Sequence, residues 1–194
     1  MNWETYLAFG DSITKGARTY LGYPELAGHL LNNHLSSQWN VVNSSVCGFK
    51  AIDLARHIDD HYCSLERKRA CVSTILIGTN DIKEKTKPSD FKVALDQVIL
   101  KAKMLTVRGN VIIMSIPSFH RGITYPYSVA MNDDIAALNA EIQWLAAEHN
   151  IRMLNVNHTE LDFTDGVHLN DHGVVTFSDQ VAKYILCDKG INLN

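Results

Sequence analysis

The fold of this chain is decided by the stretch GNVIIMSIP, residues 109–117. Six residues rich in β-branched side chains stand between a Gly-Asn pair and a proline, and both boundaries are typical of turns. An apolar run of this length predicts a strand that is buried on both faces. Strands of this kind are typical of parallel sheets that helices cover on both sides.

On either side of this strand, apolar runs alternate with amphipathic helical patterns, which predicts an α/β fold built on a parallel sheet. The other predicted strands are 5–9, 41–42, 72–77 and 151–156. The predicted helices are 24–35, 51–62, 88–107, 132–148 and 172–186. A chain of 194 residues is within the size that one core can serve, and it contains no repeat or linker. We therefore expect a single domain over residues 1–194.

The charge balance argues against a highly charged partner. The chain has 18 Lys and Arg against 21 Asp and Glu, a formal net charge of −3. This imbalance is too small to indicate binding to nucleic acid or to an anionic membrane. The short basic run at 66–69 has no aromatic residues around it and is interpreted as an exposed helix end or loop. No apolar stretch approaches transmembrane length, so stable membrane insertion is not expected.

The start of the chain and its cysteines bear on location. Residues 1–5 lack the basic and apolar runs of a secretory signal, which favours a cytoplasmic protein. The cysteines show no Cys-x-x-Cys spacing and no clustering with histidine, so no metal site is predicted. We expect free, buried thiols in a reducing compartment. They are Cys47, Cys63, Cys71 and Cys187.

Four short motifs occur in a fixed order, and each follows a predicted strand. They are Gly10-Asp11-Ser12, Gly48, Gly78-Thr79-Asn80-Asp81 and Asp165-Gly166-Val167-His168. Together they contain a nucleophile, hydrogen-bond donors and an oriented base, which are the groups that acyl transfer needs. In open α/β sheets ligands bind outside the carboxyl ends of the strands. We therefore expect the four loops to converge on one edge of the sheet.

These motifs resemble those of the SGNH hydrolases, also called GDSL esterases and lipases. The matching blocks are residues 9–14 with Gly16, residues 43–48, residues 78–81, and residues 165–170 with Gly173. The second block has Val46-Cys47 where family members often carry another small residue or glycine. The resemblance implies a three-layer α/β/α sandwich with a mostly parallel, five-stranded, flavodoxin-like sheet.

The resemblance also assigns chemical roles. Ser12 would be the nucleophile, and a serine hydroxyl needs an adjacent base to take its proton. His168 would be that base, and Asp165, three residues earlier, would hold the imidazole tautomer. Three oxyanion donors are implied: the backbone N–H groups of Ser12 and Gly48, and the side-chain amide of Asn80. A glycine at position 48 would let the backbone approach the substrate closely.

Each motif taken alone also has a purely structural explanation. A Gly-Asp-Ser sequence after a strand often forms a turn that caps a helix, and Asn80-Asp81 is typical of an Asx turn. A single histidine is most often a surface or core residue. The occurrence of all four motifs in order favours the catalytic interpretation. Asp11 and Asp81, which flank the predicted site, are expected mainly to cap and hydrogen-bond the loops.

Two loops, 14–23 and 117–129, are long enough to shape specificity. Arg18 or Arg121 could meet an anionic group on a substrate. The alternative is that the aromatic residues of these loops only pack them onto the domain. The residues that could contact a substrate are Asp11, Arg18, Tyr20, Thr79, Phe119, Tyr125 and Val167.

The expected function is that of a serine esterase that hydrolyses small or short-chain carboxylic esters through an acyl-enzyme intermediate. It would act on a small-molecule ester, with no cofactor and no metal. Two alternatives use the same site: a carbohydrate O-acetylesterase, and a lysophospholipase or acyl-thioesterase. A non-catalytic ligand-binding module is a further alternative, but it would be expected to have lost a member of the triad. The sequence does not indicate an oligomeric state.

Overall fold

The computed structural model describes residues 3–34 and 37–188 and contains a five-stranded sheet in the order β2-β1-β3-β4-β5. Every neighbouring pair of strands is parallel. This order is the flavodoxin-like one. The strands are β1 (Trp3–Gly10), β2 (Gln38–Asn43), β3 (Val72–Leu76), β4 (Val111–Met114) and β5 (Arg152–Leu154).

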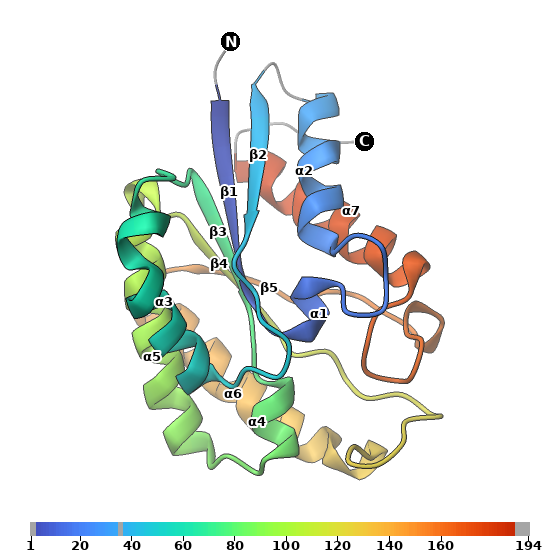
Figure 1. Ribbon diagram of the computed structural model, residues 1–194. Coiled ribbons are helices and arrows are strands. Elements are labelled where there is room, and N and C mark those ends of the chain that lie inside the picture. Colours follow the sequence, from blue (N-terminus) through green and yellow to red (C-terminus); the bar gives the residue numbers. More distant parts are fainter. Residues whose placement is uncertain (1–2, 35–36, 189–194) are drawn as a thin grey trace.

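Helices cover both faces of the sheet, which confirms the three-layer α/β/α arrangement (Figure 1). The α-helices are α1 (Ser12–Lys15), α2 (Tyr23–His34), α3 (Ala51–Glu66), α4 (Thr79–Lys83), α5 (Pro88–Leu105), α6 (Asn132–Glu148) and α7 (Asp171–Asp188). Short 3₁₀ helices are η1 (Val107–Gly109), η2 (Val129–Met131) and η3 (Glu160–Asp162). Among the helices described, none is long and apolar enough to cross a membrane.

Two apolar cores lie on opposite faces of the sheet. Successive side chains of a strand point to opposite faces, so Leu7 and Phe9 of β1 enter one core while Tyr6 and Ala8 enter the other. The first core is completed by α3, α5 and α6, and the second by α2 and α7. All five residues of β3 are buried, as expected of a strand in the middle of a covered parallel sheet.

All of the predicted strands and long helices are present, with differences at their ends. β2 is longer than the predicted 41–42, because polar residues such as Asn40 are tolerated on an edge strand. β5 has three residues instead of the six predicted. The helix predicted at 24–35 is described as far as His34, and Leu35 lies outside the described residues. The four-residue α1 and five-residue α4 were not predicted, because helices this short show no periodicity.

The cysteines are free, but the prediction that they are buried is wrong. Cys71 is half-buried, and Cys47, Cys63 and Cys187 are exposed. The reason is their position: Cys47 lies in the loop after β2, and Cys63 and Cys187 lie on solvent-facing surfaces of α3 and α7. A small apolar side chain does not by itself direct a residue to the core.

The carboxyl ends of the strands carry the motif loops, as predicted. α1 follows β1 directly, and α4 begins three residues after β3 ends. The loop after β2 is held against the end of β1, because the Ser44 and Val46 N–H groups donate to the carbonyl oxygens of Ala8 and Gly10. The Asp165–His168 segment lies between β5 and α7. All four motifs therefore lie at one edge of the sheet.

Candidate active site

Ser12 is presented by a tight junction between β1 and α1. Gly10 ends the strand, and a Cβ there would clash with the side chain of Thr14 and the carbonyl oxygen of Leu76. Asp11 caps the short helix, since its Oδ1 accepts a hydrogen bond from the N–H of Ile13 at 3.0 Å. The capping role predicted for Asp11 is confirmed. This junction fixes the first residue of α1, Ser12, at the edge of the sheet.

Ser12, His168 and Asp165 form a continuous hydrogen-bonded chain. The Ser12 Oγ atom is 3.0 Å from Nε2 of His168. On the other side of the imidazole ring, Nδ1 is 2.8 Å from Oδ2 of Asp165. Residues 156 positions apart are thus brought into contact in the order that was predicted for a nucleophile, its base and an orienting carboxylate. Such a chain can move a proton from the hydroxyl to the imidazole while the carboxylate holds the ring.

The Asp165 carboxylate is held in place by its own turn. Its Oδ1 accepts hydrogen bonds from the N–H groups of Val167 and His168, at 3.1 and 2.8 Å. Burial alone would raise the pKa of Asp165, but the hydrogen bonds from the His168 backbone and ring hold this pKa below its usual value. The carboxylate therefore stays charged near neutral pH, as an acceptor for the imidazole N–H must.

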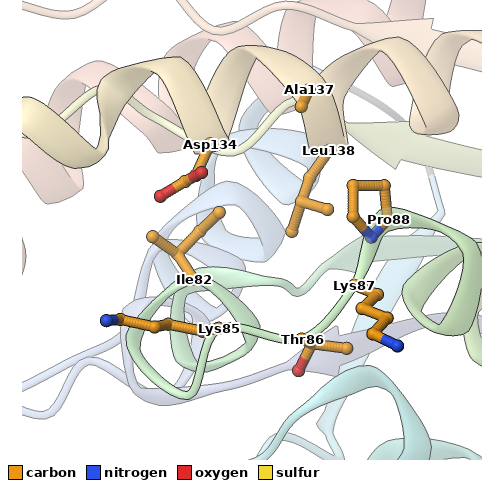
Figure 2. A pocket seen from close by; sticks show the side chains of 8 residues that line it. All are labelled: Ile82, Lys85, Thr86, Lys87, Pro88, Asp134, Ala137 and Leu138. Carbon is orange, nitrogen blue, oxygen red and sulfur yellow. The ribbon is translucent and has the colours of Figure 1, made fainter.

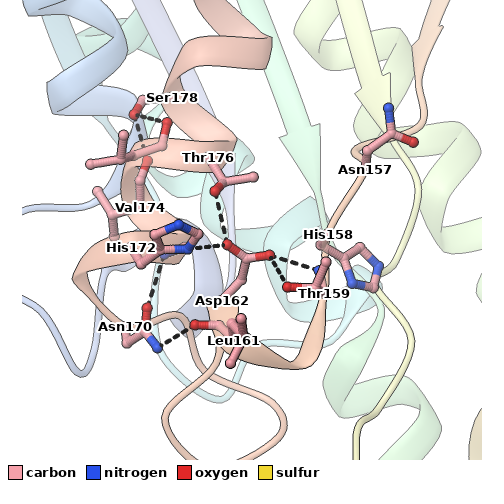
Figure 3. A network of polar contacts seen from close by, with 12 residues as sticks. Asn157, His158, Thr159, Leu161, Asp162, Asn170, His172, Val174, Thr176 and Ser178 are labelled. Carbon is pink, nitrogen blue, oxygen red and sulfur yellow. Dashed lines mark hydrogen bonds and ion pairs between the residues drawn. The ribbon is translucent and has the colours of Figure 1, made fainter.

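A second carboxylate, Asp162, ties this turn to α7 (Figure 3). The Asp162 side chain accepts from the backbone N–H of Thr159, from Nδ1 of His172 at 2.8 Å and from the hydroxyl of Thr176 at 2.8 Å. Its backbone carbonyl accepts from the N–H of Asn170. The Asp165–His168 turn thus projects from a short loop whose two ends are fixed to the first turns of α7.

Asn80 is joined to the loop that carries Gly48 by a hydrogen bond to Phe49. The Asn80 Nδ2 atom donates to the carbonyl oxygen of Phe49 at 3.0 Å, which joins α4 to the loop after β2. Gly48 has a φ of 85°, and an added Cβ would meet no atom within 4 Å. Glycine is therefore required here by the left-handed backbone and not by crowding. Asp81 supports the same loop, since its Oδ2 accepts from the N–H of Ala51 at 2.9 Å.

Tyr127 belongs to the 117–129 loop that was expected to shape specificity, but it was not among the residues predicted for the site. Its hydroxyl lies 3.5 Å from Oδ1 of Asn80, toward which it donates, and its ring packs edge-on against Phe119. Burial, with the nearby charge of Asp11, raises the pKa of Tyr127 to about 12, so the phenol remains a donor. The amide of Asn80 is held at both ends, and one of its two N–H bonds has no partner among the described residues. The only sequence signal was the place of Tyr127 in the 117–129 loop.

A cavity of about 190 Å³ opens beside His168. Three of the residues predicted to contact a substrate, Arg18, Tyr125 and Val167, line it. Tyr125 is 95% exposed and Val167 is buried, so one forms the rim and the other the floor. The full lining is Arg18, residues 123–127, Asp165, Val167 and His168.

The other four predicted contact residues do not line this cavity. Asp11, Thr79 and Phe119 are buried within the fold, where they support the loops. Tyr20 is almost fully exposed and lies outside the cavity lining. A substrate contact at these four positions stays a prediction.

A separate cavity of about 270 Å³ lies between α4, the segment after it and α6 (Figure 2). Its apolar lining includes Ile82, Pro88 and Leu138, with Lys85 and Lys87 among the polar residues. It shares no lining residue with the cavity beside His168. Within the described residues, no cluster of three or more His, Cys, Asp or Glu side chains is arranged to hold a metal ion.

Several solved structures share the fold over nearly the whole chain. The psychrotrophic esterase EstA from Pseudoalteromonas sp., a structure inhibited by monoethylphosphonate, has a TM-score of 0.75 at 16% identity, covering 97% of this chain and 100% of that one. The acetyl xylan esterase AlAXEase has a TM-score of 0.77 at 21% identity, covering 93% and 99%. A variant of the acetyl xylan esterase Axe2 from Geobacillus stearothermophilus has a TM-score of 0.68 at 19% identity, covering 98% and 96%.

At these identities the structural likeness establishes the fold alone. No curated protein matches the sequence. The model of the GDSL-like Lipase/Acylhydrolase family matches residues 8–174, a span that begins in β1 and includes all four motifs. The chain therefore belongs to the GDSL-like lipase/acylhydrolase family.

Proposed function

We propose that this protein is a single-domain serine esterase that hydrolyses small or short-chain carboxylic esters through an acyl-enzyme intermediate. One observation carries the proposal: the unbroken contact from Ser12 Oγ through the His168 ring to the Asp165 carboxylate, beside an open cavity. The nucleophile and base are within hydrogen-bond reach, and a third group orients the base. The proposed chemistry uses protein groups alone.

In the proposed reaction, Ser12 Oγ attacks the ester carbonyl while His168 Nε2 takes its proton. The imidazolium, held by Asp165, then gives this proton to the departing alcohol. A water molecule then attacks the acyl-enzyme by the same steps, with His168 taking its proton and returning it to Ser12 Oγ, and the acid is released. In both halves the carbonyl oxygen becomes negative and is stabilised by the Ser12 and Gly48 N–H groups and by the free N–H bond of Asn80.

The size of the cavity supports a small acyl or alcohol group. At about 190 Å³ it lies below the roughly 300–1,000 Å³ that is usual for drug-sized ligands. A long acyl chain, as in a lysophospholipid or acyl thioester, would need a larger apolar slot than this cavity of about 190 Å³. A carbohydrate O-acetylesterase is the second candidate. The ring of Tyr125, exposed at the rim, favours it because such a ring can pack against a sugar.

The test is a series of nitrophenyl esters from acetate to a medium chain, with Ser12→Ala as background. We expect kcat/KM to fall steeply as the acyl chain lengthens, and Ser12→Ala to abolish turnover and labelling by a fluorophosphonate. Ser44→Ala is a matched control, because Ser44 Oγ also contacts a histidine ring, that of His57, at 3.1 Å. Labelling that survives in Ser12→Ala would refute the assignment. A rate that rises with chain length would refute the substrate class.

A further inference from the structure

Arg18 is the one Lys or Arg among the described residues that line the cavity beside His168. It lies in the loop between α1 and α2, and its side chain is 58% exposed. Its Nε atom is 3.7 Å from Oδ2 of Asp165. This distance allows an ion pair, but it is too long for a good hydrogen bond.

The guanidinium of Arg18 has donors to spare. Both Asp165 oxygens already have hydrogen-bond partners, since Oδ2 accepts from the His168 ring and Oδ1 accepts two backbone N–H groups. The Arg18 guanidinium makes no hydrogen bond to another described residue. An exposed ion pair of this length adds little to stability. A guanidinium group with five N–H donors thus lines the cavity while contributing little to the stability of the fold.

We propose that the cavity takes esters that carry an anionic group, a carboxylate or a phosphate, near the ester bond, and that Arg18 binds this group. The inference rests on the proposed esterase function and names the class of its substrate. The planar guanidinium matches the oxygens of both anions and can bind either through two parallel hydrogen bonds. The charged end of the substrate would meet Arg18 at the exposed part of the lining, where Tyr125 also lies.

The size of the effect follows from the exposure of Arg18. Water and salt screen a half-exposed charge, so the preference for an anionic over a neutral ligand should be about tenfold at low ionic strength. It should shrink at high ionic strength for the same reason. The affinity for a neutral ligand should respond much less to salt.

The first arm of the test measures binding without turnover. The probes are N-acetyl-β-alanine, its neutral carboxamide, and 2-acetamidoethylphosphonate, in each of which an amide replaces the ester. Dissociation constants are measured by NMR titration for the wild type, Arg18→Gln and Arg121→Gln. Arg121→Gln removes the same charge from an exposed residue of the 117–129 loop that does not line the cavity. Thermal unfolding confirms that each variant is folded.

We expect the wild type and Arg121→Gln to bind an anionic probe about tenfold more tightly than the carboxamide, and Arg18→Gln to bind them equally. The carboxylate and phosphonate arms identify which anion is preferred. Equal affinity of the wild type for all three probes overturns the inference, as does a preference that persists in Arg18→Gln.

The second arm separates this inference from the esterase proposal. It compares turnover of 3-acetoxypropanoate with that of 3-acetoxypropanamide, with Ser12→Ala as background. If neither acetate is hydrolysed but the anionic probes bind through Arg18, the esterase proposal fails and the anion site stands. If both acetates are hydrolysed at the same kcat/KM and the probes bind equally, the esterase stands and the anion site fails.

Discussion

Asp11 is a fully buried carboxyl group next to Ser12 in the chain, and its environment makes folding stability depend on pH. Burial, with a contribution from the charge of Asp81, raises its pKa to about 7, although the N–H of Ile13 and the hydroxyl of Thr79 oppose the shift. The folded pKa lies above the unfolded value, so the folded protein binds a proton that the unfolded chain has lost. The contribution of Asp11 to the free energy of unfolding therefore increases as pH falls from about 7 toward 4. This contribution is lost as pH rises through 7.

Asp11→Asn removes this titration while keeping an oxygen for the Ile13 N–H. We expect the free energy of unfolding of the wild type, relative to Asp11→Asn, to fall by up to roughly 4 kcal/mol between pH 4 and pH 8. Urea unfolding of both proteins across this range measures the difference. Two parallel stability curves would show that Asp11 titrates alike in the folded and unfolded states.

Tyr127 is expected to act through Asn80. Tyr127→Phe keeps the ring that packs on Phe119 but removes the hydroxyl that holds Oδ1 of Asn80. We expect kcat to fall about three- to tenfold with little change in KM, because a neutral hydrogen bond is worth about 1 kcal/mol. Asn80→Ala should cost about 10²- to 10³-fold, as loss of an oxyanion donor does.

The double variant decides whether Tyr127 is a positioning residue. If it acts through Asn80, adding Tyr127→Phe to Asn80→Ala should lower kcat no further. Tyr184→Phe is the matched control, because its hydroxyl donates to the carbonyl oxygen of Met153 at 2.8 Å, away from the site. Fully additive losses in the double variant would contradict the assignment.

At the scale of elements, the link between α7 and the Asp165–His168 turn depends on Asp162. Burial alone would raise the pKa of Asp162, but hydrogen bonds from Thr159, Thr176 and His172 hold this pKa below its usual value. The stability it contributes is therefore present above the unfolded pKa of about 3.9 and is lost as pH falls through the lower folded pKa.

Asp162→Asn should lower the free energy of unfolding by about 2 kcal/mol at pH 7, because it weakens several charge-assisted hydrogen bonds at once. The loss should be smaller near pH 3. The control is Asp179→Asn on α7, whose half-exposed ion pair with Lys183 should contribute less than about 1 kcal/mol. Denaturant unfolding of the three proteins at both pH values checks this. Equal losses from both substitutions would contradict the role of Asp162.

The elements also show how far the sequence could predict this protein. β4 could be predicted from its β-branched run and the turn residues at both ends. The convergence of Ser12 and His168 could be predicted because each of the four motifs comes after a parallel strand. α1 and α4 could not be predicted, since they are stabilised by the junctions they complete and not by an apolar face. The contact of Tyr127 with Asn80 could not be predicted either, because it depends on how a long loop folds back over the sheet.

At the scale of the whole molecule, the site and the C-terminal end of α5 lie at opposite ends of the sheet. β1 has eight residues, so its two ends are roughly 23 Å apart. Ser12 follows the carboxyl end, while Leu105 ends α5 near the amino end, where Thr106 pairs with Ala70 just before β3. Stability at that end should therefore be separable from activity.

Leu105→Ala tests this separation. Leu105 is 3% exposed and packs in the core between the sheet and α5, so its truncation should cost about 2–5 kcal/mol. At temperatures where the variant remains folded, kcat/KM should match the wild type, because the motif loops follow the opposite, carboxyl ends of the strands. Met104→Ala, one residue earlier and 69% exposed, is the control and should change stability by less than about 0.5 kcal/mol. A folded Leu105→Ala protein with strongly reduced kcat/KM would show that the two ends are coupled through β3 and α5.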